Sequence, residues 1–232
     1  MPPERLTLAD APFVGRTGHG VRVAVVDSGI APNHPHVGGL VSTGVSLIGA
    51  GDDTADRLGH GTAVAAVIRE KAPDAELVPI RIFDRELATD AATLARAIDW
   101  ALENGCRIVN LSLGTANAAH AGLLQGALER AARHDATVIS AFESDGVRWL
   151  PGSQGLALGV VAAPELDRDT IEFEAVAGEG VRVRASIYPR PIPGVPKERN
   201  LHGVSFAVAN VSGFMARLAE GTSGPIALPV TF

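Results

Sequence analysis

The fold is decided by the stretch Val21-Arg-Val-Ala-Val-Val-Asp27-Ser-Gly-Ile30. Its valines predict a buried strand at residues 21–26, because β-branched side chains favour extended backbone, and Ser28-Gly29 ends the strand. An acidic side chain at the end of an apolar strand is costly to bury without a partner. Open α/β sheets place their binding crevice at that edge. We therefore expect Asp27 to meet a cation or a hydrogen-bond donor, and a histidine from elsewhere in the chain is the candidate.

Composition narrows the class of protein. With 232 residues, 46% of them hydrophobic and 20% charged, the chain fits a globular protein, and we expect a single domain over residues 1–232. The net charge of −6 gives no support to nucleic-acid binding, and no apolar run approaches the roughly 20 residues of a membrane span. Cys106 is the single cysteine, so an internal disulfide is excluded and a buried thiol is expected. The N-terminus lacks a signal-peptide pattern, which favours a cytoplasmic location.

Strands and helices alternate along the chain, which predicts an α/β fold with a mostly parallel central sheet and helices on both faces. Further strands are expected at 76–83, 107–113, 137–141 and 156–163, and helices at 63–71, 91–104, 120–134 and 205–219. Pro79 is unfavourable inside the strand at 76–83. We interpret residues 1–20 as a polar lead-in, 31–59 as loop-rich, and 164–200 as short antiparallel strands with a proline-rich loop.

The acidic run Gly51-Asp-Asp-Thr-Ala-Asp56 is a candidate calcium loop. It lacks the regular ligand spacing of such loops, so a solvated acidic loop is the preferred interpretation. No metal and no cofactor are expected.

Three segments carry side chains that could act together. Asp27 ends a strand, His60 opens a helix within Gly59-His-Gly-Thr62, and Ser205 opens another within His202-Gly-Val-Ser-Phe-Ala207. A serine hydroxyl is a poor nucleophile unless a base takes its proton. Imidazole has a suitable pKa, and a buried carboxylate can orient the ring. Each motif alone is weak, since a serine at a helix start is usually a cap; together they indicate nucleophilic catalysis.

With Ile108-Val-Asn-Leu-Ser-Leu-Gly114, these motifs make the chain resemble the subtilisin-like serine peptidases over roughly residues 20–220, and the order Asp, His, Ser is that of the family. The resemblance is to a compact, divergent member without an evident pro-region, and it implies a subtilisin-like three-layer fold. It also implies that Asp27, His60 and Ser205 form a catalytic triad. Ser112, Leu113 and Gly114 would then pair with the substrate backbone as an added strand.

The chain departs from the family pattern at the oxyanion hole. Ser144 replaces the asparagine that donates to the developing oxyanion, and Glu143 stands where a small residue lines the specificity pocket. Losing such a donor costs about 2.7–4 kcal/mol, which is roughly a hundred- to a thousandfold in rate. The backbone N–H of Ser205 remains as a donor. Other departures are Ala63 at the second histidine of the histidine motif, and Val204, Phe206, Ala209 and Asn210 around the serine.

The family pattern also indicates which residues form the specificity pocket. One wall is expected from Ala141, Phe142 and Glu143, the other from Ser112, Leu113 and Gly114, and the floor from Trp149. If Trp149 points inward, the pocket is shallow and favours a small residue before the scissile bond. If Glu143 points inward, it favours Lys or Arg. The alternatives are a core tryptophan, and a glutamate that is solvated or paired with Arg148.

The sequence therefore predicts a serine endopeptidase that hydrolyses peptide bonds through an acyl-enzyme. A weakened oxyanion hole favours slow, selective processing of a specific peptide or protein precursor. The expected partner is that substrate, with a possible companion protein that delivers it, and neither nucleic acid nor a membrane. The alternative is a peptide-binding module that has kept the fold and groove but lost catalysis.

Overall fold

The computed structural model describes residues 3–49, 53–176 and 180–229 of the chain. Its central strands are β2 (Arg22–Asp27), β4 (Glu76–Arg81), β5 (Ile108–Leu111), β6 (Thr137–Ser144) and β8 (Leu158–Ala162). The outer strands are β1 (Glu4–Thr7), β3 (Val45–Ser46), β7 (Val147–Arg148), β9 (Thr170–Val176) and β10 (Gly180–Ala185). The helices are α1 (His60–Lys71), α2 (Ala91–Glu103), α3 (Ala121–Arg133) and α4 (Val204–Ala219), with short 3₁₀ turns at Ala118–His120 and Lys197–Arg199.

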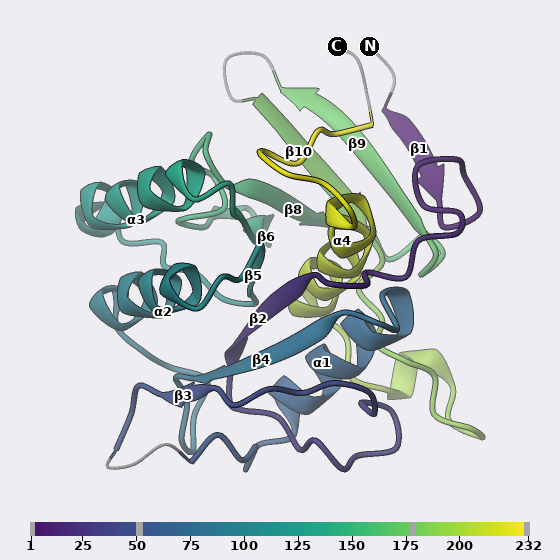
Figure 1. Cartoon of the computed structure of the whole chain (residues 1–232), viewed down its shortest axis with the longest axis horizontal. Helices are drawn as coiled ribbons and strands as arrows, with labels where there is room; N and C mark the ends of the chain where they lie inside the picture. The colour runs from purple at the N-terminus through teal and green to yellow at the C-terminus, as the bar shows by residue number, and fades with distance from the viewer. Residues whose placement is uncertain (1–2, 50–52, 177–179, 230–232) are drawn as a thin grey trace.

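The strands form one sheet in the order β1-β9-β10-β8-β6-β5-β2-β4-β3, with β7 paired to β6 (Figure 1). From β10 to β3 each neighbouring pair is parallel. The antiparallel pairs are β1 with β9, β9 with β10, and β6 with β7. The expected mostly parallel sheet is confirmed, and so is the antiparallel pairing within residues 164–200.

Helices cover both faces of the sheet. The paired helices α1 and α4 pack on one face and α2 and α3 on the other, which Figure 1 shows as two groups on opposite sides of β2 and β5. The two apolar cores are rich in Val, Ile, Leu and Ala, as the near-continuous apolar runs of the central strands require. This arrangement confirms the three-layer α/β fold. Within the described ranges, no helix is long and apolar enough to cross a membrane.

Pro79 lies inside β4, a position that is unfavourable for proline because its nitrogen carries no hydrogen to donate. The backbone N–H of Glu76 donates inward to Val21 of the segment leading into β2, while that of Leu77 donates outward to Leu40. Because strand donors alternate sides, the N–H that Pro79 lacks would face outward, where only the two-residue β3 and its approach pair with β4. The missing donor is therefore confined to the weakly paired side of the strand.

Cys106 is buried, as expected. Burial raises the pKa of its thiol to about 11, although the nearby charge of Arg22 acts in the opposite direction. A thiol with so high a pKa has almost no nucleophilic thiolate at neutral pH.

The interpretation of residues 1–20 as a polar lead-in was wrong. Leu6 lies in β1, which adds an antiparallel edge strand against β9. Phe13 is fully buried, and its ring packs edge-on against that of Phe214 in α4, with the centroids 5.0 Å apart. The segment is short and mixed in composition, so its one core side chain produces no periodic signal.

We predict that Phe13→Ala destabilises the fold by about 3–5 kcal/mol, because it removes a buried aromatic ring and leaves a cavity. The neighbouring Val14 is 62% exposed, so Val14→Ala should change stability by no more than about 0.5 kcal/mol. Denaturant unfolding of the two variants measures both values. Equal effects would contradict the placement of Phe13 in the core.

Candidate active site

Asp27 and His60 meet at the carboxyl edge of the sheet, and Ser205 lies at the same edge, beside the end of β5. β2 ends at Asp27, α1 begins at His60, and Ser205 is the second residue of α4. The Asp27 side chain is fully buried, and His60 Nδ1 lies 2.8 Å and 3.0 Å from its two carboxylate oxygens. The backbone N–H of Ser28 also donates to Asp27, at 2.8 Å. Asp27 thus has the donors that sequence reasoning expected at this position, and the histidine is one of them.

Glycine at position 61 allows α1 to start against the end of β2. A Cβ atom at Gly61 would lie 2.2 Å from the carbonyl oxygen of Gly29 and 3.1 Å from Cβ of Asp27. Any side chain would therefore push the first turn of α1, and His60 with it, away from the carboxylate. This close approach is the physical reason for glycine after the histidine.

Asp56 is the residue that sequence reasoning missed at this site. The expected solvated loop acid is instead half-buried, while Gly51 and Asp52 of the same run lie outside the described residues. One oxygen of Asp56 accepts the N–H groups of Leu58 and Gly59, and the other accepts the N–H and hydroxyl of Thr62. Gly59 has no side chain to cap α1, so Asp56 accepts a free donor of its first turn instead, the N–H of Thr62.

A serine links this second carboxylate to the Asp27–His60 pair. The Ser28 hydroxyl lies 2.8 Å from Asp56 Oδ1 and 3.2 Å from Asp27 Oδ1, and it accepts the backbone N–H of Gly61 at 3.0 Å. The strand end, the acidic loop and the first turn of α1 are therefore held in one hydrogen-bonded unit. The sequence shows a polar segment before the Gly-His-Gly motif. It does not indicate which acidic residue of that segment folds back onto α1.

The surroundings of His60 favour its charged form. Burial of the ring acts to lower the pKa of His60, but the hydrogen bond and charge of Asp27, with the charge of Asp56, outweigh burial and raise that pKa above its ordinary value. Burial also acts to raise the pKa of the Asp56 carboxyl, but hydrogen bonds from Thr62, Ser28 and Gly59 outweigh it and hold that pKa low. Asp56 is therefore ionised at neutral pH and acts on His60 as a fixed negative charge.

Ser205 does not point at the histidine in this structure. Its Oγ donates to the backbone carbonyl of Ser112 at 3.0 Å, and between these two described residues, Ser205 and His60, no hydrogen bond is formed. The next side chain, Phe206, places its ring 5.8 Å from the His60 ring, centroid to centroid. The acid and the base are therefore assembled, while the hydroxyl is in a rotamer that engages the neighbouring strand end.

Buried hydrogen bonds hold the Ser112 side chain in place. Asn110 on β5 donates from Nδ2 to Ser112 Oγ at 2.8 Å, and its Oδ1 accepts the hydroxyl of Ser212 on α4 at 3.0 Å. All three side chains are buried. This polar chain ties the end of β5 to the helix that carries Ser205. The strand expected at 107–113 ends at Leu111, so Ser112 and Leu113 leave the sheet.

Ser144, the expected oxyanion donor, lies at the end of β6. The strand expected to end at residue 141 continues to Ser144 and turns through Asp145 and Gly146 into β7. The Ser144 hydroxyl donates to the Asp145 carboxylate at 2.9 Å in this rotamer. Glu143 lies opposite Arg148 across the hairpin. The hairpin was not expected, because the sequence signals of a two-residue strand are too weak to distinguish from a loop.

The expected wall at Ser112, Leu113 and Gly114 lies close to Trp149, the expected floor of the specificity pocket. Thr115, next to Gly114, forms a bridge with Leu150, with N–H to carbonyl distances of 2.9 Å in both directions. A Cβ at Gly114 would lie 2.6 Å from the Leu150 carbonyl and 3.1 Å from Cβ of Trp149. Trp149 is partly buried, with its Nε1 among the buried polar atoms that have no partner. Backbone contact therefore closes this gap.

The remaining pocket residues lie on β6. Ala141 and Phe142 are buried, and the Phe142 ring is flanked by the guanidinium groups of Arg148 and Arg182, at 5.1 Å and 5.5 Å from its centroid. Phe142 therefore supports the hairpin from beneath.

Comparison with known proteins adds independent findings. Residues 18–186 match the model of the subtilase family. The chain is 30% identical to the thermostable alkaline protease of Halalkalibacterium halodurans over 223 residues, 87% of this chain and 57% of that protein. It is 31% identical to the minor extracellular protease Epr of Bacillus subtilis over 62% of this chain and 23% of that protein. The chain thus spans less than two thirds of the length of these curated relatives.

Solved structures agree with the fold. The prenylagaramide maturation protease PagA is 25% identical, with a TM-score of 0.60 over 85% of this chain and 74% of that one. A lanthipeptide protease has a TM-score of 0.66 at 19% identity, over 88% of this chain and 74% of that one. MycP1 without its N-terminal propeptide has a TM-score of 0.67 at 23% identity, over 88% and 78%.

We predict that the pKa of His60 in an NMR titration lies above its ordinary value, and that Asp56→Asn lowers it by removing a nearby negative charge. Because the folded-state pKa is the higher one, the stability from this group is fully present below about pH 6.5 and is lost as the pH rises through the raised pKa.

The matched control for that titration is Asp53→Asn, three residues upstream, whose carboxylate is exposed and pairs with Arg57. It should leave the His60 midpoint in place. Equal midpoints in the wild type and Asp56→Asn would contradict the coupling of Asp56 to His60.

Proposed function

The chain belongs to the subtilase family, and on that basis we propose that it is a serine endopeptidase that cleaves peptide bonds through an acyl-enzyme. The observation that carries the proposal is the 2.8 Å contact between His60 Nδ1 and the buried Asp27 carboxylate. A carboxylate at Nδ1 holds the proton on that nitrogen, so that the neutral ring presents Nε2 as a base. Ser205 lies at the same edge of the sheet, at the start of α4.

In the proposed reaction, Ser205 Oγ attacks the substrate carbonyl carbon while His60 Nε2 takes the hydroxyl proton. The C–N bond then breaks, His60 returns the proton to the leaving amine, and the acyl group stays on Ser205. Water, deprotonated by the same ring, attacks the ester and releases the acid and the serine hydroxyl. Throughout, Asp27 stays ionised and stabilises the imidazolium.

The reaction requires Ser205 to leave the Ser112 carbonyl. Rotation about χ1 between staggered rotamers is sufficient for such a change. We propose that the substrate drives it: a backbone N–H that pairs with the edge at Ser112, Leu113 and Gly114 competes for the Ser112 carbonyl and releases the Ser205 hydroxyl towards His60. The fixed position of Ser112 supports this role, because the buried Asn110–Ser212 chain prevents the carbonyl from following the hydroxyl.

Stabilisation of the oxyanion would come from the Ser205 backbone N–H and from the Ser144 hydroxyl, once the latter turns away from Asp145. A hydroxyl shared with a neighbouring carboxylate is a weaker donor for this purpose than a free amide. We therefore propose slow turnover and selective processing of a peptide or protein precursor, with a small residue before the scissile bond. The likeness to PagA, a prenylagaramide maturation protease, supports processing over digestion.

The second candidate is a peptide-binding module without catalysis. Two observations favour it: the Ser205 hydroxyl is bonded to Ser112, and the Ser144 hydroxyl is bonded to Asp145. That a companion protein delivers the substrate stays a prediction, and so does the cytoplasmic location. One relative is named as an extracellular enzyme, the minor extracellular protease Epr.

We predict that a fluorophosphonate probe labels Ser205 of the folded protein, because the His60–Asp27 pair activates that hydroxyl. Ser205→Ala should abolish labelling, whereas Ser223→Ala, at an exposed serine, should not change it. Mass spectrometry of the labelled peptide identifies the site. A folded wild type that stays unlabelled, yet binds peptides as tightly as Ser205→Ala, would establish the binding module instead.

We further predict that Ser144→Asn raises kcat by about a hundredfold. The asparagine amide reaches further than the serine hydroxyl and would restore the donor to the oxyanion. KM should change little, because the donor acts mainly on the transition state. Steady-state kinetics on one peptide substrate measures both constants. An unchanged or lower kcat would show that residue 144 does not face the oxyanion.

A further inference from the structure

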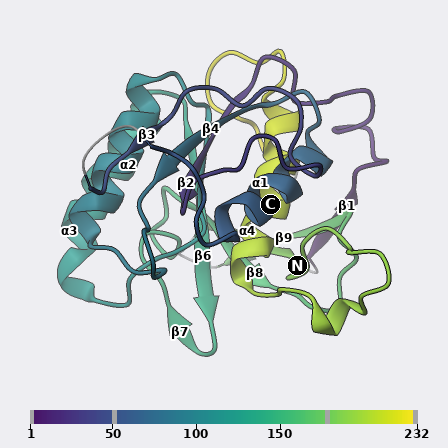
Figure 2. The same cartoon turned by 90° about the horizontal axis from the view of Figure 1, so that it is seen from below.

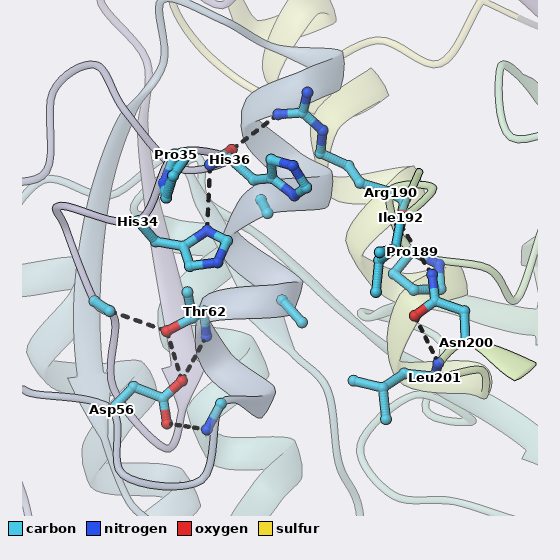
Figure 3. Close-up of a pocket in the computed structure, with 14 residues that line it drawn as sticks. His34, Pro35, His36, Asp56, Thr62, Pro189, Arg190, Ile192, Asn200 and Leu201 are labelled. Carbon is cyan, nitrogen blue, oxygen red and sulfur yellow. Dashed lines mark hydrogen bonds between the residues drawn. The ribbon is translucent and has the colours of Figure 1, made fainter. Parts of the chain in front are cut away.

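A cavity of about 500 Å³ opens beside the first turns of α1, the helix that begins at His60. Three segments enclose it: residues 31–36 just after Asp27, the first two turns of α1, and residues 189–201 just before Ser205. Figure 3 shows His34, Thr62 and Asp56 on one side of the opening, with Ile192, Asn200 and Leu201 facing them from the other. Each enclosing segment is thus adjacent in sequence to one of the three proposed catalytic residues.

The position of the cavity relates it to one half of a bound substrate. The acyl half is proposed to lie along Ser112, Leu113 and Gly114, and no residue of 111–115 or 140–150 lines the cavity. Figure 2 shows the β6–β7 hairpin and the segment that leads into α4 on opposite sides of that helix. A substrate whose acyl half follows the edge at Ser112 must continue past Ser205 and His60 towards this cavity. The half that continues there is the leaving segment.

Two of the polar side chains at the cavity, Thr62 and Asn200, are already engaged in hydrogen bonds. Thr62 Oγ donates to Asp56 and accepts the backbone N–H of Ala31. Asn200 donates to the Arg190 carbonyl and accepts the N–H of Leu201. These groups have little hydrogen-bonding capacity left for a ligand, so they do not select a polar occupant.

Several apolar side chains of the cavity walls, in contrast, are exposed. The walls include Ala31, Pro35, Ala63, Ala66, Ile192 and Leu201. Ile192 is 46% exposed and Leu201 is 55% exposed. Ala63 presents only a methyl group on the floor, where the histidine motif of the family carries a second histidine. A concave apolar site of several hundred Å³ with exposed walls is typical of a binding pocket.

The charges at the rim disfavour a basic occupant. Burial lowers the pKa of His36, and the charges of Arg190 and His34 lower it further, with Glu70 opposing them, so His36 is neutral at physiological pH. The Arg190 guanidinium donates to the His36 carbonyl at 3.0 Å. The Asp56 carboxylate lies at the inner end, fully occupied by its own donors. A Lys or Arg side chain would meet a guanidinium and find no free acid.

We propose that this cavity binds a large apolar side chain of the substrate, at one of the first three residues after the cleaved bond. The inference rests on the proposed peptidase function and adds to it a recognition site on the leaving segment. Three residues of extended chain span about 10 Å, which is about the length of the first two turns of α1. Selectivity would then depend on both halves of the substrate, with a small residue before the bond and a large apolar one after it.

The first experiment uses the wild-type chain and a library of peptides from a digested proteome, with cleavage sites read by mass spectrometry. We expect Phe, Leu, Ile or Met to be enriched at one position among the first three after the cleaved bond. Two quenched fluorescent peptides that differ only there, Phe against Ala, should differ in kcat/KM by about tenfold or more.

The second experiment repeats the Phe/Ala comparison in variants. Ala63→Leu adds side-chain volume to the cavity lining, and Ile192→Ala removes an apolar side chain from it. Ile192 lies in an exposed loop, so its truncation should not affect folding. Both variants should reduce the kcat/KM ratio to about threefold or less. Leu123→Ala, at an exposed leucine of α3 that does not line the cavity, should keep the wild-type ratio. Because each ratio is internal to one protein, differences in active fraction cancel.

The failures of the two proposals are distinguishable. If fluorophosphonate does not label Ser205 and no peptide is cleaved, the peptidase proposal falls and this one with it. If peptides are cleaved without a leaving-side preference, or with one that neither variant changes, only this inference is overturned. It is also overturned if sedimentation shows a dimer that Ile192→Asp dissociates while the Phe/Ala ratio stays at the wild-type value, since the cavity would then hold a second copy of the chain.

Discussion

The buried carboxylate of Asp27 is the constraint on which the rest of the structure depends. A fully buried charge is tolerated only when donors surround it, since an uncompensated one costs about 3–5 kcal/mol. The donors come from the following residue and from a histidine 33 positions later, so the start of α1 must lie against the end of β2. Gly61 makes that approach possible, and Asp56, reaching both α1 and Ser28, holds it in place. The geometry of the base is therefore a consequence of satisfying one buried charge.

The nucleophile depends on a different set of contacts. Ser205 is placed by α4, whose buried face is tied to β5 through Asn110 and Ser212, and the same chain fixes Ser112. The Ser112 carbonyl can accept either the Ser205 hydroxyl or a substrate N–H, so one acceptor connects substrate binding to activation of the serine. Backbone contact between Thr115 and Leu150 closes the edge beside it, whereas the cavity along α1 has apolar walls. On the proposed assignment, the two sides of the site place opposite demands on the two halves of a substrate.

Local sequence patterns were sufficient for much of this arrangement. The strand before Asp27, the helices that start at His60 and beside Ser205, and the parallel sheet follow from apolar runs and glycine positions, which act over a few residues. Phe13 could not be predicted, because one core side chain in a short irregular segment has no periodicity. Nor could the capping role of Asp56, since which acid of a loop folds back depends on tertiary contacts with Ser28 and Thr62. The Ser205 rotamer depends on the distant Ser112, and the β6–β7 hairpin on a two-residue pairing. Each missed feature rests on contacts between residues far apart in sequence or on elements too short to leave a pattern.

In the proposed mechanism, the Asp27 carboxylate makes His60 a base for Ser205. The most direct test is the rate constant for phosphonylation of Ser205 in Asp27→Asn, compared with the wild type at the same pH and with folding checked by thermal unfolding. The amide keeps the size of the side chain but removes its charge and favours the wrong tautomer of the ring. We expect a fall of about 10⁴-fold in a folded variant. A folded variant that reacts within about threefold of the wild-type rate would contradict this mechanism.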